Sequence, residues 1–144
     1  MSPELIFQLC STIALIGWLL LILVNPLWFS VDKLLVGIII TLFGIVYTWL
    51  IATGFQLSDL SAFGTLDGVM QIFTDKALVT AGWVHYLAFD LMTGIWIKKN
   101  SIQHGISAWL VFPCLLLTFM FGPIGLLLYL LFRWMVTKQY FASN

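Results

Sequence analysis

The feature that most constrains this 144-residue chain is the spacing of its charged residues. Residues 5–31, 34–58 and 100–132 contain no Asp, Glu, Lys or Arg, and residues 77–97 contain only Asp90. An α-helix needs about 20 mostly apolar residues to cross the hydrocarbon core of a bilayer, and each stretch is long enough. The sequence therefore predicts an all-α integral membrane protein, a bundle of four transmembrane helices.

The expected helices share one membrane domain that covers residues 1–144. Their approximate ranges are 5–29, 34–54, 77–97 and 107–134. The first is too long for the apolar region of a signal peptide and follows Glu4 instead of a basic residue, so we expect it to be retained. Boundary signals agree with these ranges: Asn25-Pro26 after the first helix, Gly54 after the second, and Thr74-Asp75 before the third.

Composition supports the membrane assignment and excludes other classes. Hydrophobic residues make up 62% of the chain and charged residues 8%, and the mean hydropathy is +1.08, which rules out a conventional soluble domain. The net charge is zero, so no basic surface indicates nucleic acid as a partner. Lys and Arg divide equally between the two sets of loops and do not set the orientation, but four crossings would place both termini on one side.

Aromatic and sulfur-containing residues fit the same interpretation. Five of the seven tryptophans lie near ends of the expected helices, where an indole suits the membrane interface: Trp28, Trp49, Trp96, Trp109 and Trp134. Trp18 and Trp83 are interior exceptions. Cys10 and Cys114 fall inside expected helices without a redox motif, so we interpret them as packing residues.

Three segments carry packing or turn signals. The connection over 55–76 predicts either a short interfacial or re-entrant helix within 60–73 or a covering loop, and both interpretations stay open. Pro113 and the Gly122–Gly125 segment predict kinks in the fourth helix. The second helix carries a stripe of small residues that would let a neighbouring helix approach closely, namely Gly37, Thr41, Gly44, Thr48 and Ala52.

Candidate chemistry is concentrated in the third helix. His85, Tyr86 and Asp90 lie at hydrocarbon depth, where an ionised side chain costs about 2.5–3.5 kcal/mol on an insertion scale. Such groups must face protein or a cavity, and they could act as proton donors and acceptors. At 100° per residue His85 and Asp90 are about 140° apart, so they do not share a face. The alternative is that they are hydrogen-bonding residues between helices.

Several other sites are excluded or unsupported. Two histidines cannot build the histidine-rich di-iron sites of membrane desaturases, and no phosphate-binding loop or nucleophile elbow occurs. A metal site from His85, Asp90 and His104 has no supporting spacing motif, so no metal or cofactor is predicted. We expect Arg133 to snorkel to the interface and to pair with Asp75.

Two segments resemble the motif regions of the abscisic-acid-deficient-4-like family. The first is Gly82–Leu91 with Gly94 and Trp96, and the second comprises Pro113, Leu115–Thr118 and Phe121–Tyr129. The family consists of small polytopic membrane proteins whose plant members are required for neoxanthin synthesis from violaxanthin. The resemblance implies four membrane helices and an epoxide-opening isomerisation without net redox change, which calls for an acid and a base at positions matching His85 and Asp90.

The resulting hypothesis is a membrane protein that binds and isomerises or modifies a carotenoid-like or other isoprenoid lipid. Candidate catalytic residues are His85, Asp90 and Tyr86; candidate substrate contacts are Trp83, Phe89, Thr93, Pro113 and Thr118. The expected partners are the apolar ligand, membrane lipids, and a second copy or another membrane protein. The competing hypothesis is a non-catalytic pigment-binding or partner-binding protein in which His85 and Asp90 are interhelical hydrogen-bonding residues.

A small transporter or channel would need polar residues on several helices, whereas only the third supplies them. The chain lacks the plastid extension of plant members, so it resembles a bacterial inner-membrane relative or a mature plastid-membrane protein.

Overall fold

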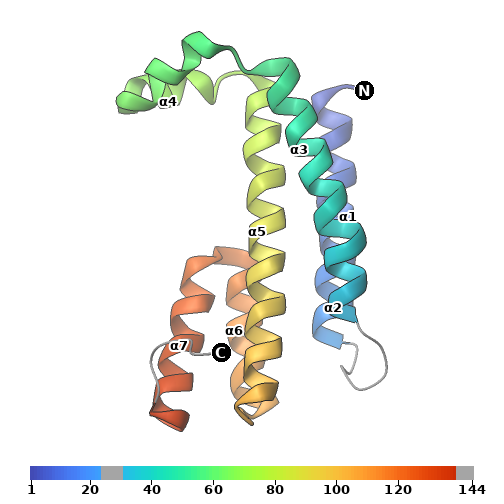
Figure 1. Cartoon of the computed structure of the whole chain (residues 1–144), viewed down its shortest axis with the longest axis vertical. Helices are drawn as coiled ribbons and strands as arrows, with labels where there is room; N and C mark the ends of the chain where they lie inside the picture. Colours follow the sequence, from blue (N-terminus) through green and yellow to red (C-terminus); the bar gives the residue numbers. More distant parts are fainter. Residues whose placement is uncertain (24–30, 139–144) are drawn as a thin grey trace. The chain divides into compact units, whose positions relative to one another are not determined.

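The computed structural model describes residues 1–23 and 31–138, and every regular element among them is a helix (Figure 1). The elements are α1 (Pro3–Leu23), α2 (Val31–Leu34), the π-helix η1 (Leu35–Ile40), α3 (Thr41–Gly54), the 3₁₀-helix η2 (Leu57–Gly64), α4 (Leu66–Ile72), α5 (Lys76–Gln103), α6 (Ala108–Phe121) and α7 (Pro123–Thr137). The prediction of an all-α protein is confirmed.

The chain forms two compact units, and each is described separately. Unit 1 comprises Met1–Ile16 and Leu34–Ala88, and unit 2 comprises Gly17–Lys33 and Phe89–Asn144. Helices α1 and α5 contribute residues to both. Two helical segments, Pro3–Leu23 and Leu35–Gly54, are long and apolar enough to cross a membrane. The last part of the first predicted helix, with Asn25-Pro26 and Trp28, lies outside the described residues.

Helix α5 starts where the sequence predicted and ends later. The Asp75 carboxylate accepts hydrogen bonds from the backbone N–H groups of Ala77 (2.8 Å) and Leu78 (3.0 Å), so the predicted cap is confirmed. The helix then continues through Gln103, six residues beyond the expected end at 97. The turn after the helix includes Gly105, whose φ of 63° is a conformation that glycine adopts readily.

The connection before α5 contains helices of its own. The Thr65 hydroxyl caps α4 by accepting from the Gly68 N–H at 3.1 Å, while the Gln56 N–H donates to the Asp59 carboxylate at 2.8 Å at the start of η2. Gly68 also packs directly on the backbone of Ala62, where a Cβ atom would overlap. The sequence left open whether residues 60–73 contain a short helix or form a covering loop, and the structure has a short helix, α4, in this range.

The small-residue stripe of the second predicted helix is on an exposed face. Positions 37, 41, 44, 48 and 52 are all exposed, and within the described residues no atom lies within 4 Å of a Cβ built on Gly37 or Gly44. The buried face of this helix instead carries Leu35, Phe43 and Leu50. The expectation that a neighbouring helix of this chain packs on the stripe is therefore not met in the described part of the chain.

The structure differs most from the prediction over residues 107–134, where two helices replace one. The chain reverses at Gly122, with a φ of 43°, so that α6 and α7 lie side by side as a helical hairpin (Figure 1). Pro123 has no N–H with which to continue α6, and glycine tolerates the left-handed turn. Gly125 completes the hairpin, because a Cβ there would overlap the backbone of Thr118 and Cys114.

Neither arm of this hairpin is long enough to cross a membrane alone. Helix α6 has 14 residues and α7 has 15, which corresponds to about 21–23 Å at 1.5 Å per residue. The hydrocarbon core is about 30 Å thick. The expectation of four crossings, with both termini on one side, therefore no longer follows from residues 107–134.

A buried polar group of residues connects α5 and α7 in unit 2. The Tyr129 hydroxyl donates to the Asn100 side-chain oxygen at 2.7 Å, and the Tyr129 ring packs edge-on against Trp96. Arg133 follows one helical turn after Tyr129 and is completely buried. The expectation that Arg133 snorkels to the interface is wrong, since α7 turns this face towards the protein interior.

Candidate functional site

His85 lines an apolar pocket of about 370 Å³ in unit 1. The pocket is formed by α3, by the segment 55–73 that contains η2 and α4, and by the first half of α5. Its other lining residues are Tyr47, Ile51, Phe55, Phe63, Ile72, Phe73, Leu78 and Gly82. The His85 and Tyr47 rings are 5.5 Å apart between centroids and inclined at 48°. We call this cavity the His85 pocket.

Gly82 makes room for the aromatic wall of the His85 pocket. It precedes His85 by three positions on α5 and therefore lies on nearly the same helix face. A Cβ on Gly82 would be 3.1 Å from the Phe73 ring, a closer approach than a side chain normally makes. Two further lining rings, those of Phe55 and Phe63, are 5.9 Å apart between centroids. Glycine at position 82 thus allows Phe73, the residue that follows α4, to pack closely against α5.

Trp83 and Tyr86 belong to a different aromatic cluster of unit 1. The Trp83 indole N–H donates to the Ser11 hydroxyl at 2.9 Å, and its ring lies 5.2 Å from Phe7 and 5.4 Å from Tyr86. These contacts connect α5 with α1. Neither Trp83 nor Tyr86 is among the residues that line the His85 pocket.

Asp90 lies in unit 2, at the turn of the α6–α7 hairpin. A Cβ built on Gly122 would be 2.6 Å from the Asp90 Oδ1 atom and 3.2 Å from Oδ2. Gly122 is the N-cap of α7, and a negative charge is favourable at a helix N-terminus, where the backbone N–H groups and the helix dipole point outward. This position supplies a physical reason for a carboxylate midway along α5. Asp90 does not line the His85 pocket.

The remaining predicted ligand contacts all lie in unit 2, outside the His85 pocket. Phe89 is 62% exposed, and the Thr93 hydroxyl donates to the Phe89 carbonyl at 2.8 Å. Pro113 is half-buried inside α6. Thr118 is fully buried beneath Gly125, and its hydroxyl donates to the Cys114 carbonyl at 2.8 Å. Thr118 therefore takes part in the close contact of the hairpin arms.

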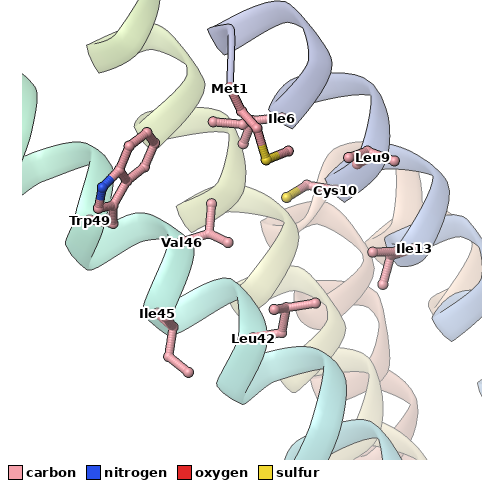
Figure 2. Close-up of a pocket in the computed structure, with 9 residues that line it drawn as sticks. All are labelled: Met1, Ile6, Leu9, Cys10, Ile13, Leu42, Ile45, Val46 and Trp49. Atoms are coloured by element: carbon pink, nitrogen blue, oxygen red, sulfur yellow. The ribbon is translucent and has the colours of Figure 1, made fainter.

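A second pocket in unit 1 was not anticipated from the sequence. It has a volume of about 390 Å³ and lies between α1 and α3 (Figure 2). Its lining is Met1, Ile6, Leu9, Cys10, Ile13, Leu42, Ile45, Val46 and Trp49. Cys10, expected to be a packing residue, is buried in its wall. The sequence did not predict this pocket, because a concave surface between two apolar helices depends on how the helices pack and not on the sequence of either one.

Metal coordination is not supported by the arrangement of ligand-type side chains. Within residues 1–23 and 31–138, no three His, Cys, Asp or Glu side chains come together in a way that could hold a metal ion. His104, the third member of the conceivable site, lies at the end of α5, where its backbone N–H donates to the Asn100 carbonyl at 3.1 Å.

Comparison with known proteins identifies one family. A family model described as ABA DEFICIENT 4-like matches residues 5–129, which include every candidate site residue and the whole turn of the hairpin. No curated protein and no solved structure matches the chain.

Proposed function

Since the chain belongs to the ABA DEFICIENT 4-like family, we propose that it is a membrane protein that binds a carotenoid-like or other isoprenoid lipid and isomerises or otherwise modifies it. The observation that carries the proposal is the His85 pocket, in which an imidazole borders a cavity that is otherwise mostly aliphatic and aromatic. Two long apolar helices, α1 and the segment Leu35–Gly54, support a membrane location.

The His85 pocket suits one end of a long apolar molecule. Its volume of about 370 Å³ is within the range of about 300–1,000 Å³ typical of small-molecule sites, but towards the small end. It would hold one end group of an isoprenoid, and the remaining chain would extend into lipid. An imidazole ring carries both a hydrogen-bond donor and an acceptor nitrogen when neutral, and an acid–base isomerisation needs both kinds of group.

The second candidate function is non-catalytic pigment binding. The location of Asp90 favours it, because a carboxylate at the N-terminus of α7 already has a structural role in holding the hairpin. If Asp90 has only this structural role, His85 is the one remaining member of the expected acid–base pair. A pocket that binds a ligand without a reaction then needs no second acid–base group. With either function, we propose a location in a bacterial inner membrane or in a plastid membrane.

Pigment analysis in cells that make defined carotenoids tests the proposal. The full chain is expressed as wild type, as His85→Ala, and as His104→Ala, which changes the other histidine and leaves the His85 pocket intact. A new pigment with wild type and His104→Ala, but not with His85→Ala, supports modification. Bound but unchanged pigment supports the binding function. Neither a product nor a co-purifying pigment across the panel would contradict both.

A further inference from the structure

We propose that Tyr47, and not Tyr86, is the tyrosine that acts with His85, by donating its hydroxyl to an oxygen atom of the ligand in the His85 pocket. The inference rests on the proposed function and adds a specificity-determining residue to it. Tyr47 lies in the middle of an apolar stretch, and nothing in the local sequence distinguishes it from a packing residue.

The geometry of α3 and α5 brings Tyr47 and His85 to the same wall. Their ring centroids are 5.5 Å apart, and both residues line the same cavity. The two residues are 38 positions apart in the sequence and belong to different helices of unit 1. Their proximity is therefore a product of helix packing.

Tyr47 and His85 have the polar side chains of the pocket lining, so they are the side chains that can form hydrogen bonds with a ligand there. All other lining residues are aliphatic or phenylalanine, apart from Gly82. In an apolar site, a few polar groups fix the orientation of the ligand and distinguish between similar molecules. A phenol O–H can donate to a ligand hydroxyl, epoxide or carbonyl oxygen, while the imidazole offers both a donor and an acceptor when neutral.

Tyr86 is committed to other contacts. Its ring packs at a tilt against Trp83, whose indole N–H donates to Ser11 of α1. Tyr86 is adjacent to His85 in sequence, but successive residues of a helix point about 100° apart, so the two side chains face different neighbours. This makes Tyr86→Phe a matched control, since it removes the same chemical group from a tyrosine of unit 1 that does not line the His85 pocket.

Binding to an oxygenated isoprenoid and to its parent hydrocarbon provides the test. The purified full chain is reconstituted in lipid nanodiscs and titrated with a ring-hydroxylated or ring-epoxidised carotenoid and with the corresponding unsubstituted carotene. We expect wild type to bind the oxygenated compound about three- to tenfold more tightly, the range expected for one net hydrogen bond. Tyr47→Phe should lose most of this preference while keeping its affinity for the hydrocarbon, which reports intact folding.

The outcomes separate this inference from the proposed function. Retention of the full preference by Tyr47→Phe, or its loss in Tyr86→Phe alone, would overturn the role of Tyr47 and leave isoprenoid binding standing. Equal binding of both compounds by wild type would also overturn it, since no oxygen would then be recognised. If wild type binds neither compound, the proposed function fails together with the inference.

Discussion

His85 and Asp90 lie five positions apart on α5, yet they meet entirely different surroundings. His85 borders a pocket whose other residues come mainly from α3 and from the segment 55–73, whereas Asp90 contacts the turn of the α6–α7 hairpin. A cavity and a helix N-terminus can each accommodate a polar side chain of a neighbouring helix. Residue type and position on one helix therefore do not distinguish a ligand site from a structural contact, whereas the packing around each side chain does.

Two glycines, Gly82 in unit 1 and Gly125 in unit 2, also have different surroundings. Gly82 borders the His85 pocket and faces the movable edge of a Phe73 ring, while Gly125 faces the backbone of α6 itself. A ring can shift by a few tenths of an ångström, but the backbone of a helix cannot do so without losing its hydrogen bonds. Position 125 should therefore tolerate added volume less well than position 82 does.

The largest expected effect is at the hairpin. Gly125→Val would force α7 away from Thr118 and Cys114, and we expect it to cost more than about 3 kcal/mol of stability, at or above the upper end for overpacked sites. Thermal unfolding of the detergent-solubilised chain measures this. Gly44→Ala is the control, because it adds a methyl group into open space within the described structure. An unfolding midpoint of Gly125→Val equal to that of wild type would contradict the close packing of α6 on α7.

An intermediate effect should distinguish Asp90 from His85 directly. Asp90→Ala removes the negative charge at the N-terminus of α7, and we expect a loss of about 1–2 kcal/mol in stability. His85→Ala changes an exposed side chain and should stay within about 0.5 kcal/mol of wild type, while it abolishes or weakens pigment binding. The opposite result would be an Asp90→Ala variant that is stable but binds no pigment, together with an unstable His85→Ala variant. It would assign the ligand-binding role to Asp90 and the structural role to His85.

The smallest expected effect is at the wall of the His85 pocket. Gly82→Ala places a methyl group 3.1 Å from the Phe73 ring, which can give way, so stability should change by less than about 0.5 kcal/mol. The narrowed pocket should still weaken carotenoid binding by a few-fold, measured by titration in nanodiscs. Gly64→Ala, a position with no atom within 4 Å of the new carbon, should leave affinity unchanged. Identical affinities for the two variants would place the ligand outside the His85 pocket.

Sequence reasoning located most helices but not the reversal at Gly122. Both Pro113 and the Gly122–Gly125 segment were interpreted as sources of kinks, and Pro113 indeed remains inside α6. Whether a glycine–proline pair bends a helix or reverses the chain depends on what the following residues can contact. Here Gly125 lets α7 pack against α6, a contact that local propensities do not contain.

The candidate site residues also differ in whether a local sequence signal or a contact between helices identifies them. His85 was predicted from its type and depth, and the structure places it at a pocket. Tyr47 and the pocket at Cys10 were missed, since each depends on the register between two apolar helices. Thr118 was selected from a motif, but it is buried within the hairpin, where a small hydroxyl residue packs under a glycine.

The sequence by itself determined an all-helical chain, the positions of its apolar stretches, the Asp75 cap of α5 and the family to which the chain belongs. These follow from periodicity, composition and local capping, which act over a few residues. Only the tertiary structure decided that 107–134 forms a hairpin, that Arg133 is buried, and that His85 pairs with Tyr47 while Asp90 faces Gly122. These depend on contacts between residues of different helices, and one apolar helix surface does not specify its partner.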